Sequence, residues 1–236
     1  IVNPIVYYSA AETIEEIADR IMTVASAGIP DFNLEGIQDA GYVAGHIYLA
    51  VSRHDGEDAS VIARPYLNLD VIMKVVMGED DRTGMVSTVK ATSGLLEMAG
   101  MSEEDAWAAA YANSRSEMTI RSMAEMLGFP DDGNFPLHVA TTKSGNDGAA
   151  ALCYPDLFAD FCMEKGFEAL YILPSSTQEV IAVPTGPHQA SQLAQMVRDI
   201  NGSAADPKIQ LDPAAYLYCL SDNSISVVAD LSKEVA

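Results

Sequence analysis

The hydrophobic residues of this chain recur with two different periods. Spacings of three and four residues predict helices, because apolar side chains at these spacings share one helix face, whereas strict alternation predicts strands. Together with capping and turn residues, these periods predict helices at 12–27, 34–52 and 88–99, from 102 onward, and at 120–127, 156–165 and 188–201. Strands are predicted at 1–8, 65–76, 137–142, 149–153, 169–173, 179–183, 215–220 and 224–229.

The first part of the chain, 1–130, is predicted to be rich in helix. The helix at 12–27 carries acids in its first turn and ends at Gly28. Ser102 caps a second clear helix, and three acids follow it at the positive end of the helix dipole. The one strand predicted in this portion covers 65–76, where apolar and polar residues alternate.

The second part, 131–236, is predicted to supply most of the sheet. Polar loops at 143–148 and 174–177 each join two predicted strands, which is the pattern of β-hairpins. Consecutive hairpins favour an antiparallel sheet over a doubly wound parallel one. We therefore expect an α+β fold, with an antiparallel sheet built mainly from the C-terminal half, flanked by helices, and a helical N-terminal portion. The Pro- and Gly-rich stretch 130–136 separates two portions that we expect to form one compact unit.

Acidity is the strongest feature of the composition. The 236 residues include 34 Asp and Glu but 13 Lys and Arg, a formal net charge of -21, and acids outnumber bases in 1–60, 61–130 and 131–236 alike. A field of this sign repels phosphate backbones and anionic lipid headgroups, so we expect no direct binding of nucleic acid or membranes. Solubility is the ordinary explanation of such a charge. The more specific explanation is a surface that docks on a basic protein partner.

Cysteine content and hydropathy favour a cytoplasmic protein. Cys153, Cys162 and Cys219 form an odd and sparse set, which is not the pattern of a disulfide framework. No apolar run approaches the ~20 residues that span a bilayer. The chain begins at Ile1 and not at Met, which leaves room for a leader upstream.

The sequence lacks the common motifs of catalysis and cofactor binding. It contains no phosphate-binding loop, no dinucleotide-binding glycine pattern, no zinc-protease motif, no nucleophile elbow and no complete EF-hand loop. The four histidines are widely scattered, and no two cysteines have the spacing of a zinc ligand pair. We therefore expect no metal and no cofactor, and a binding role is favoured over catalysis.

The hairpin turn at 174–179 is the first candidate site. Ser175 and Ser176 lie close to Glu179, so one of these hydroxyls would act as the nucleophile of a hydrolase if a base arrived from elsewhere in the chain. The competing interpretation is structural, because Ser and Thr close turns through local hydrogen bonds to the backbone.

The predicted strand at 65–76 provides the second candidate site. Asn68, Asp70 and Lys74 alternate with apolar residues and therefore share one face of the strand. On an open sheet face these side chains would bind a small polar ligand. A solvated strand face is the ordinary alternative.

Two further features attract attention. Cys153 stands at a predicted strand end before a helix, where a thiol pKa can be lowered, although a buried and inert cysteine is the usual outcome. Trp107 and Tyr111 share a helix face, with several of the eleven methionines nearby in the sequence. Such a surface suits adaptable binding, and ordinary core packing explains it as well.

Several short segments, in order, resemble a family of domains of unknown function. The best marker is Ile-Leu-Pro-Ser-Ser at 172–176 followed by Glu-Val-Ile at 179–181. The other segments are 14–17, 66–70, 148–154, 196–201 and 216–218. The chain resembles a clostridial family from gut Firmicutes, often carried on integrative and mobile elements. The resemblance implies a cytoplasmic protein of bacterial or mobile-element origin.

Two positions depart from the pattern of that family. Gln178 stands where the family usually has His, and Leu211-Asp212-Pro213 stands where it usually has Leu-Ser-Asp. A His-Glu pair at this turn would lose its proton acceptor, because an amide does not take up a proton near neutral pH. The resemblance transfers no catalytic residue.

Three hypotheses about function follow. The leading one is a non-enzymatic interaction or regulatory protein, with the acidic surface docking on a basic protein partner. The second is a hydrolase that uses Ser175 or Ser176 with Glu179. The third is a module that binds a small ligand on the sheet face around Asn68 and Asp70. The sequence does not predict an oligomeric state.

Overall fold

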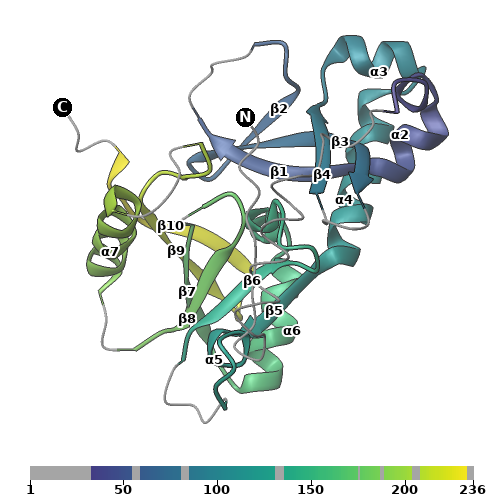
Figure 1. The fold of residues 1–236 in the computed structure, drawn as a ribbon. Coiled ribbons are helices and arrows are strands. Elements are labelled where there is room, and N and C mark those ends of the chain that lie inside the picture. Colours follow the sequence, from purple (N-terminus) through teal and green to yellow (C-terminus); the bar gives the residue numbers. More distant parts are fainter. Residues whose placement is uncertain are drawn as a thin grey trace, which may run out of the picture.

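The structure of this protein is a computed structural model, and it contains two antiparallel sheets with helices packed around them (Figure 1). The predicted elements at 1–8 and 12–27 lie outside the described residues. The residues that the structure describes are 33–54, 59–80, 85–130, 136–174, 176–186, 189–203 and 208–232.

The first sheet has four strands and is centred on the long strand β3 (Leu69–Asp80). All of β1 (Ile47–Arg53) pairs with one edge of β3, opposite the residues from Leu69 to Val75. The other edge is shared by two strands, because β2 (Ala63–Tyr66) pairs with the beginning of β3 and β4 (Met85–Lys90) pairs with its later part. All three pairings are antiparallel.

This sheet corrects the expectation of a helical N-terminal portion with one strand. The predicted helix at 34–52 is in fact η1 (Gly36–Gln38), α2 (Ala40–His46) and then β1. Its three glycines weaken a helix, and the alternation of Ile47, Leu49 and Val51 with smaller or polar residues suits pairing with β3. The sheet content is therefore not concentrated in the C-terminal half.

The predicted strand at 65–76 is two strands joined by a turn. Leu67 has a φ of 57°, in the left-handed region, and with Asn68 it reverses the chain between β2 and β3. β3 also continues beyond the predicted end at 76, because Gly78 pairs with β4 after a bulge. Of the predicted helix at 88–99, the first part belongs to β4 and α3 (Ser93–Ala99) forms the remainder.

The second sheet has six strands in the order β10-β9-β7-β8-β6-β5. The predicted hairpin of β7 (Ala169–Leu173) and β8 (Val180–Pro184) is confirmed. The predicted strands at 215–220 and 224–229 are confirmed as β9 (Ala214–Cys219) and β10 (Ser224–Asp230), which pair with each other antiparallel. β6 (His138–Thr142) is also confirmed, and β5 (Met118–Ser122) pairs with it at the sheet edge.

The segment predicted as a strand at 149–153 is instead the short helix η2 (Gly148–Cys153). Gly148 donates its N–H to the carbonyl of Gln178, 2.9 Å away, and a Cβ at Gly148 would overlap that carbonyl and Thr141. The residues from Ala149 to Leu152 are fully buried. The spacing of apolar residues in this short run fits a helix and a strand equally well. Tertiary packing, and not the local sequence, therefore decides that it forms a helix.

The remaining helices are close to their predicted positions. α4 (Glu103–Glu117) begins at Ser102, whose Oγ accepts the N–H of Asp105 at 3.1 Å. α6 (Pro155–Lys165) ends at Gly166, whose φ of 74° terminates the helix. α7 covers Ala190–Ser203. α5 is the short helix Met123–Met126, and the first three residues of the helix predicted at 120–127 belong to β5.

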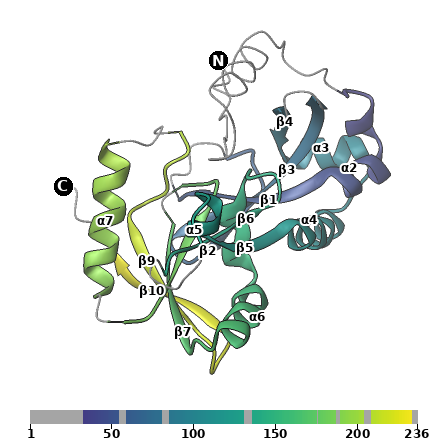
Figure 2. The ribbon, with the colours of Figure 1, turned by 60° about the horizontal axis from the view of Figure 1, so that its bottom comes forward.

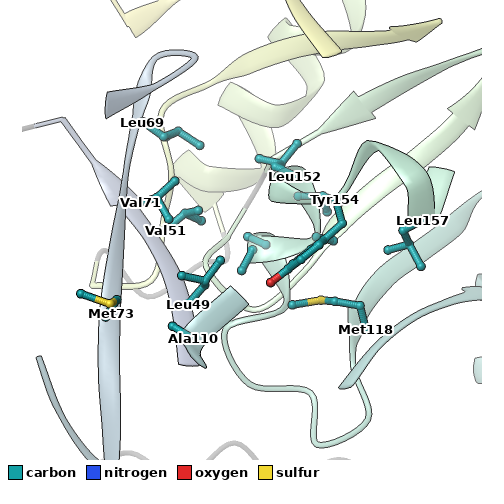
Figure 3. Packing of buried hydrophobic residues seen from close by; sticks show 14 of the residues in the cluster. Leu49, Val51, Leu69, Val71, Met73, Ala110, Met118, Leu152, Tyr154 and Leu157 are labelled. Atoms are coloured by element: carbon teal, nitrogen blue, oxygen red, sulfur yellow. The ribbon is translucent and has the colours of Figure 1, made fainter. Parts of the chain in front are cut away.

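One core joins the two sheets. In Figure 3 the side chains of Leu49, Val51 and Val71 point from the first sheet toward Leu152 and Tyr154. α7 closes a second and smaller core against β9 and β10, at the opposite end of the molecule from α2 and α3 (Figures 1 and 2). Within the described residues, no helix has the length and apolarity to cross a bilayer.

Candidate functional site

A cleft of about 550 Å³ lies along β1, between the first sheet and two loops of the second. This volume is typical of pockets that hold small molecules. One wall comes from β1, β3 and β4, and the C-terminal ends of α2 and α4 contribute to it. The opposite wall comes from the loop after β6 and from the β7–β8 turn. The polar and charged residues that line the cleft include Tyr48, Lys74, Glu79, Glu117, Asp147 and Gln178.

An ion pair spans the cleft. Lys74 Nζ lies 2.6 Å from Asp147 Oδ1, and the two side chains are 26% and 20% exposed. Lys74 projects from β3 beside Tyr48 of β1, its partner in the strand register. Asp147 precedes η2 with a φ of 52°, a left-handed conformation that Asp tolerates better than most residues. The pair ties the first sheet to the second.

The phenol of Tyr48 lies in an acidic part of the cleft. Burial raises the pKa of Tyr48, and the negative charges of Glu117 and Glu79 raise it further. Both carboxylates therefore act on the same hydroxyl. Glu117 also has Lys143 Nζ at 3.6 Å, but that lysine is 65% exposed and its charge is largely screened. This part of the cleft favours positive charge.

His46 ends α2 at the rim of the cleft. Its ring stacks on Tyr42 at a centroid distance of 3.9 Å, and its Nδ1 lies 2.8 Å from the carbonyl oxygen of Tyr42. Because a carbonyl only accepts, Nδ1 carries the hydrogen, and Nε2 of the neutral ring is a hydrogen-bond acceptor.

The β7–β8 turn contributes Gln178 to the cleft wall. Its carbonyl oxygen accepts hydrogen bonds from Gly148 N, at 2.9 Å, and from Thr141 Oγ1, at 2.8 Å. Its side-chain amide donates to Thr177 Oγ1 at 2.9 Å. The backbone of this wall is thus held by two neighbouring segments.

The serines proposed for a hydrolase belong to the same turn. Ser176 is 7% exposed; its Oγ accepts the N–H of Gln178 at 3.1 Å and donates to Glu179 Oε1 at 3.4 Å. Burial raises the pKa of Glu179, and the hydrogen bond from Ser176 opposes this rise. These bonds fit a serine that closes a turn. Ser175 lies outside the described residues, so the hydrolase remains a prediction.

The three residues proposed for the sheet-face site do not converge. Lys74 lines the cleft. Asp70, on the same face of β3, has its Oδ1 2.7 Å from His54 Nδ1. Asn68 lies in the turn before β3, where its Oδ1 accepts a hydrogen bond from the hydroxyl of Tyr216 at 2.6 Å. Of the three, Lys74 is the residue in position to contact a ligand in the cleft.

The other sequence candidates have structural partners. Burial raises the pKa of Cys153 to about 12, which corrects the suggestion of a lowered thiol pKa and removes its nucleophilic character. Trp107 is 2% exposed, donates its Nε1–H to Glu103 at 3.1 Å and has Arg64 over its ring. Tyr111, 38% exposed, stays at the surface. Across the described ranges, no group of three His, Cys, Asp or Glu side chains is placed to hold a metal ion.

The residues that sequence reasoning missed are Tyr48, Glu79, Glu117 and Asp147. Tyr48 was hidden by the helix predicted at 34–52, although its alternation with Ile47 and Leu49 is the signal of a strand. The three acids come from separate segments, and no local pattern brings them together.

Comparisons with known proteins identify a family and no activity. The profile of a family described as a family of unknown function (DUF5688) matches residues 6–219. No curated protein and no solved structure matches the chain.

Proposed function

We propose that this chain, which belongs to the family of unknown function DUF5688, is a non-enzymatic binding protein that holds a small ligand in the cleft along β1. The observation that carries the proposal is the cleft itself, of about 550 Å³, with Lys74, Asp147 and Gln178 in its walls. Cavities of this size with a few polar groups are the usual form of small-molecule sites. Of the sequence hypothesis of a ligand module on the sheet face around Asn68 and Asp70, the proposal keeps only the candidate residue Lys74.

The arrangement of the walls suits regulation by a ligand. The two walls belong to different sheets, and the Lys74–Asp147 ion pair links them across the cleft. A ligand that contacts both walls stabilises their present arrangement, because any molecule that binds the native state alone raises the free energy of unfolding. A bound ligand would therefore make the contact between the two sheets more rigid, and this change would be the regulatory signal.

Gly45 offers a direct test of the cleft. It lines the cleft in α2, and a Cβ added there would meet no atom within 4 Å. Gly45→Leu therefore places a side chain in open space at the site and leaves the fold intact, since leucine favours helix more than glycine does. Gly202→Leu is the matched control, because Gly202 lies in α7 and also has open space around it.

The experiment is a thermal-shift screen of metabolites and metal ions against the full chain and these two variants. We expect a class of stabilising compounds that raises the Tm of the wild type and of Gly202→Leu but not of Gly45→Leu. A screen without any stabiliser, or one whose compounds stabilise Gly45→Leu equally, would overturn the proposal.

A second candidate function is docking on a basic protein partner, which the sequence analysis favoured. Its support is the exposure of Glu103, Glu104 and Asp105 at the start of α4 and of Asp156 and Asp160 on α6. Arg115, at the other end of α4, contacts both α6 carboxylates and brings that end of the helix to the acids of α6. A pull-down from the native host with and without added salt tests this function: a partner retained unchanged at high salt contradicts electrostatic docking.

The cellular setting completes the proposal. Three unpaired cysteines suit the reducing cytoplasm of a bacterium, and the resemblance to a clostridial, mobile-element-borne family suits the same setting.

A further inference from the structure

We propose that the ligand of the cleft is an organic cation, such as a small amine or guanidinium compound, held by Tyr48, Glu79 and Glu117. This inference rests on the proposed binding function and names the chemical class of its ligand. It follows from the charges that remain in the cleft, the aromatic surface beside them and the balance of hydrogen-bond acceptors and donors.

The charges of the cleft do not cancel. Lys74 is neutralised by Asp147 at 2.6 Å, so this pair offers no free charge to a ligand. Glu79 and Glu117 also line the cleft; Glu79 is exposed, and Glu117, 37% exposed, has Lys143 Nζ at 3.6 Å, although Lys143 is 65% exposed and does not line the cleft. Lys90, opposite Lys74 on β4, is exposed too, so solvent screens its charge. A cationic ligand would complete this charge distribution, whereas an anion would meet two carboxylates.

Tyr48 supplies the surface on which such a cation would rest. It is half-buried, and both carboxylates act on its hydroxyl. Aromatic rings attract ammonium and guanidinium groups through their negative faces, and adjacent carboxylates strengthen the attraction. A ring and two acids on one wall thus recognise an organic cation better than a bare metal ion, which would require several oxygen ligands at fixed distances.

The hydrogen-bonding groups agree with this class. The carboxylates of Glu79 and Glu117 and the Nε2 of His46 are acceptors. Of the three N–H donors of Lys74 Nζ, one is engaged by Asp147. Because acceptors predominate at this end of the cleft, a ligand rich in N–H groups would satisfy them.

The test uses isothermal titration of the full chain with spermidine and agmatine as cationic probes. Succinate and N,N′-diacetylputrescine serve as anionic and neutral probes of similar length. We expect binding of the cations and none of the other two. Glu79→Gln and Glu117→Gln are each expected to weaken binding about tenfold, the effect of one hydrogen bond between charged groups.

The matched control is Glu97→Gln, which removes one exposed carboxylate from α3 and is not among the residues that line the cleft. It is expected to change the affinity less than about twofold, because solvent screens an exposed surface charge. Gly45→Leu is expected to abolish binding. An equal loss in Glu97→Gln, or full binding by Gly45→Leu, would show that the cations associate with the acidic surface in general and would overturn the inference.

The outcomes separate this inference from the proposed function. If succinate or the neutral probe binds and Gly45→Leu abolishes that binding, the cleft is a ligand site but the cationic class is wrong. If no probe binds the wild type, the cationic class is also wrong. The proposed function itself falls only if the thermal-shift screen finds no stabiliser that depends on the cleft.

Discussion

On one face of the β1–β3 pair, Leu49, Val71 and Met73 are at most 2% exposed and pack into the core shared with Leu152. On the opposite face, Tyr48 and Lys74 remain partly exposed and line the cleft. Alternate residues of the same two strands thus serve different purposes. Changes on the core face should cost stability, and changes on the cleft face should alter binding at a smaller cost to stability.

The largest expected effect lies on the core side of this comparison. Leu152→Ala removes a fully buried side chain that joins η2 to the first sheet, and we expect a loss of about 3–4 kcal/mol in the free energy of unfolding. Urea denaturation followed by circular dichroism measures it. A loss no greater than that of a cleft substitution would contradict the division between the two faces.

A smaller effect is expected for the ion pair between Lys74 and Asp147. The two side chains are only 26% and 20% exposed, so a double-mutant cycle with Lys74→Met and Asp147→Asn should give a coupling free energy of about 1–2 kcal/mol. Asparagine adopts the left-handed backbone conformation of residue 147 about as readily as aspartate does. The cycle therefore measures the loss of the charge interaction and not a change in backbone strain.

The control for this cycle is the pair between Lys143 and Glu117, which are 65% and 37% exposed. Its coupling should be below about 0.5 kcal/mol, because solvent screens an exposed pair. Equal couplings in the two cycles would mean that the Lys74–Asp147 pair contributes no more than an ordinary surface contact.

The smallest effect concerns the pH dependence of stability. Burial raises the pKa of Glu179, so between the ordinary carboxyl pKa and the raised one the native state binds more protons than the unfolded chain. The contribution of Glu179 to the free energy of unfolding therefore falls as pH rises through that window. Urea denaturation of the wild type and Glu179→Gln between pH 4 and pH 7 should show a steeper fall with pH in the wild type. Parallel pH curves would show that the carboxyl is not perturbed.

Much of the second sheet could be predicted because its signals are local. The β7–β8 hairpin is marked by its turn residues, α6 by Pro155 and Gly166, and α4 by the cap at Ser102. In the first sheet the strand predicted at 65–76 corresponds to β2 and β3, but β1 was missed because α2 passes directly into β1 at Ile47, and no loop separates the helical spacing from the alternation of the strand. The three glycines in this stretch weaken a helix, but they do not by themselves indicate a strand.

The site was predicted only in part for a related reason. Lys74 was singled out by its place in an alternating strand, but its partner Asp147 is 73 residues away in sequence. Asp147 stood in a polar loop that was interpreted as a hairpin connection. Tertiary structure alone brings such residues together. Tertiary packing also explains why the strand predicted at 149–153 is instead part of the short helix η2.

The double anchoring of the Gln178 carbonyl by Gly148 and Thr141 has a consequence for engineering. The peptide frame at this position is fixed by its neighbours, while the side chain is free to differ without disturbing those two bonds. A library of substitutions at position 178 would therefore sample ligand selectivity on a constant scaffold. Gly148, where a side chain would overlap its neighbours, must be left unchanged in any such library.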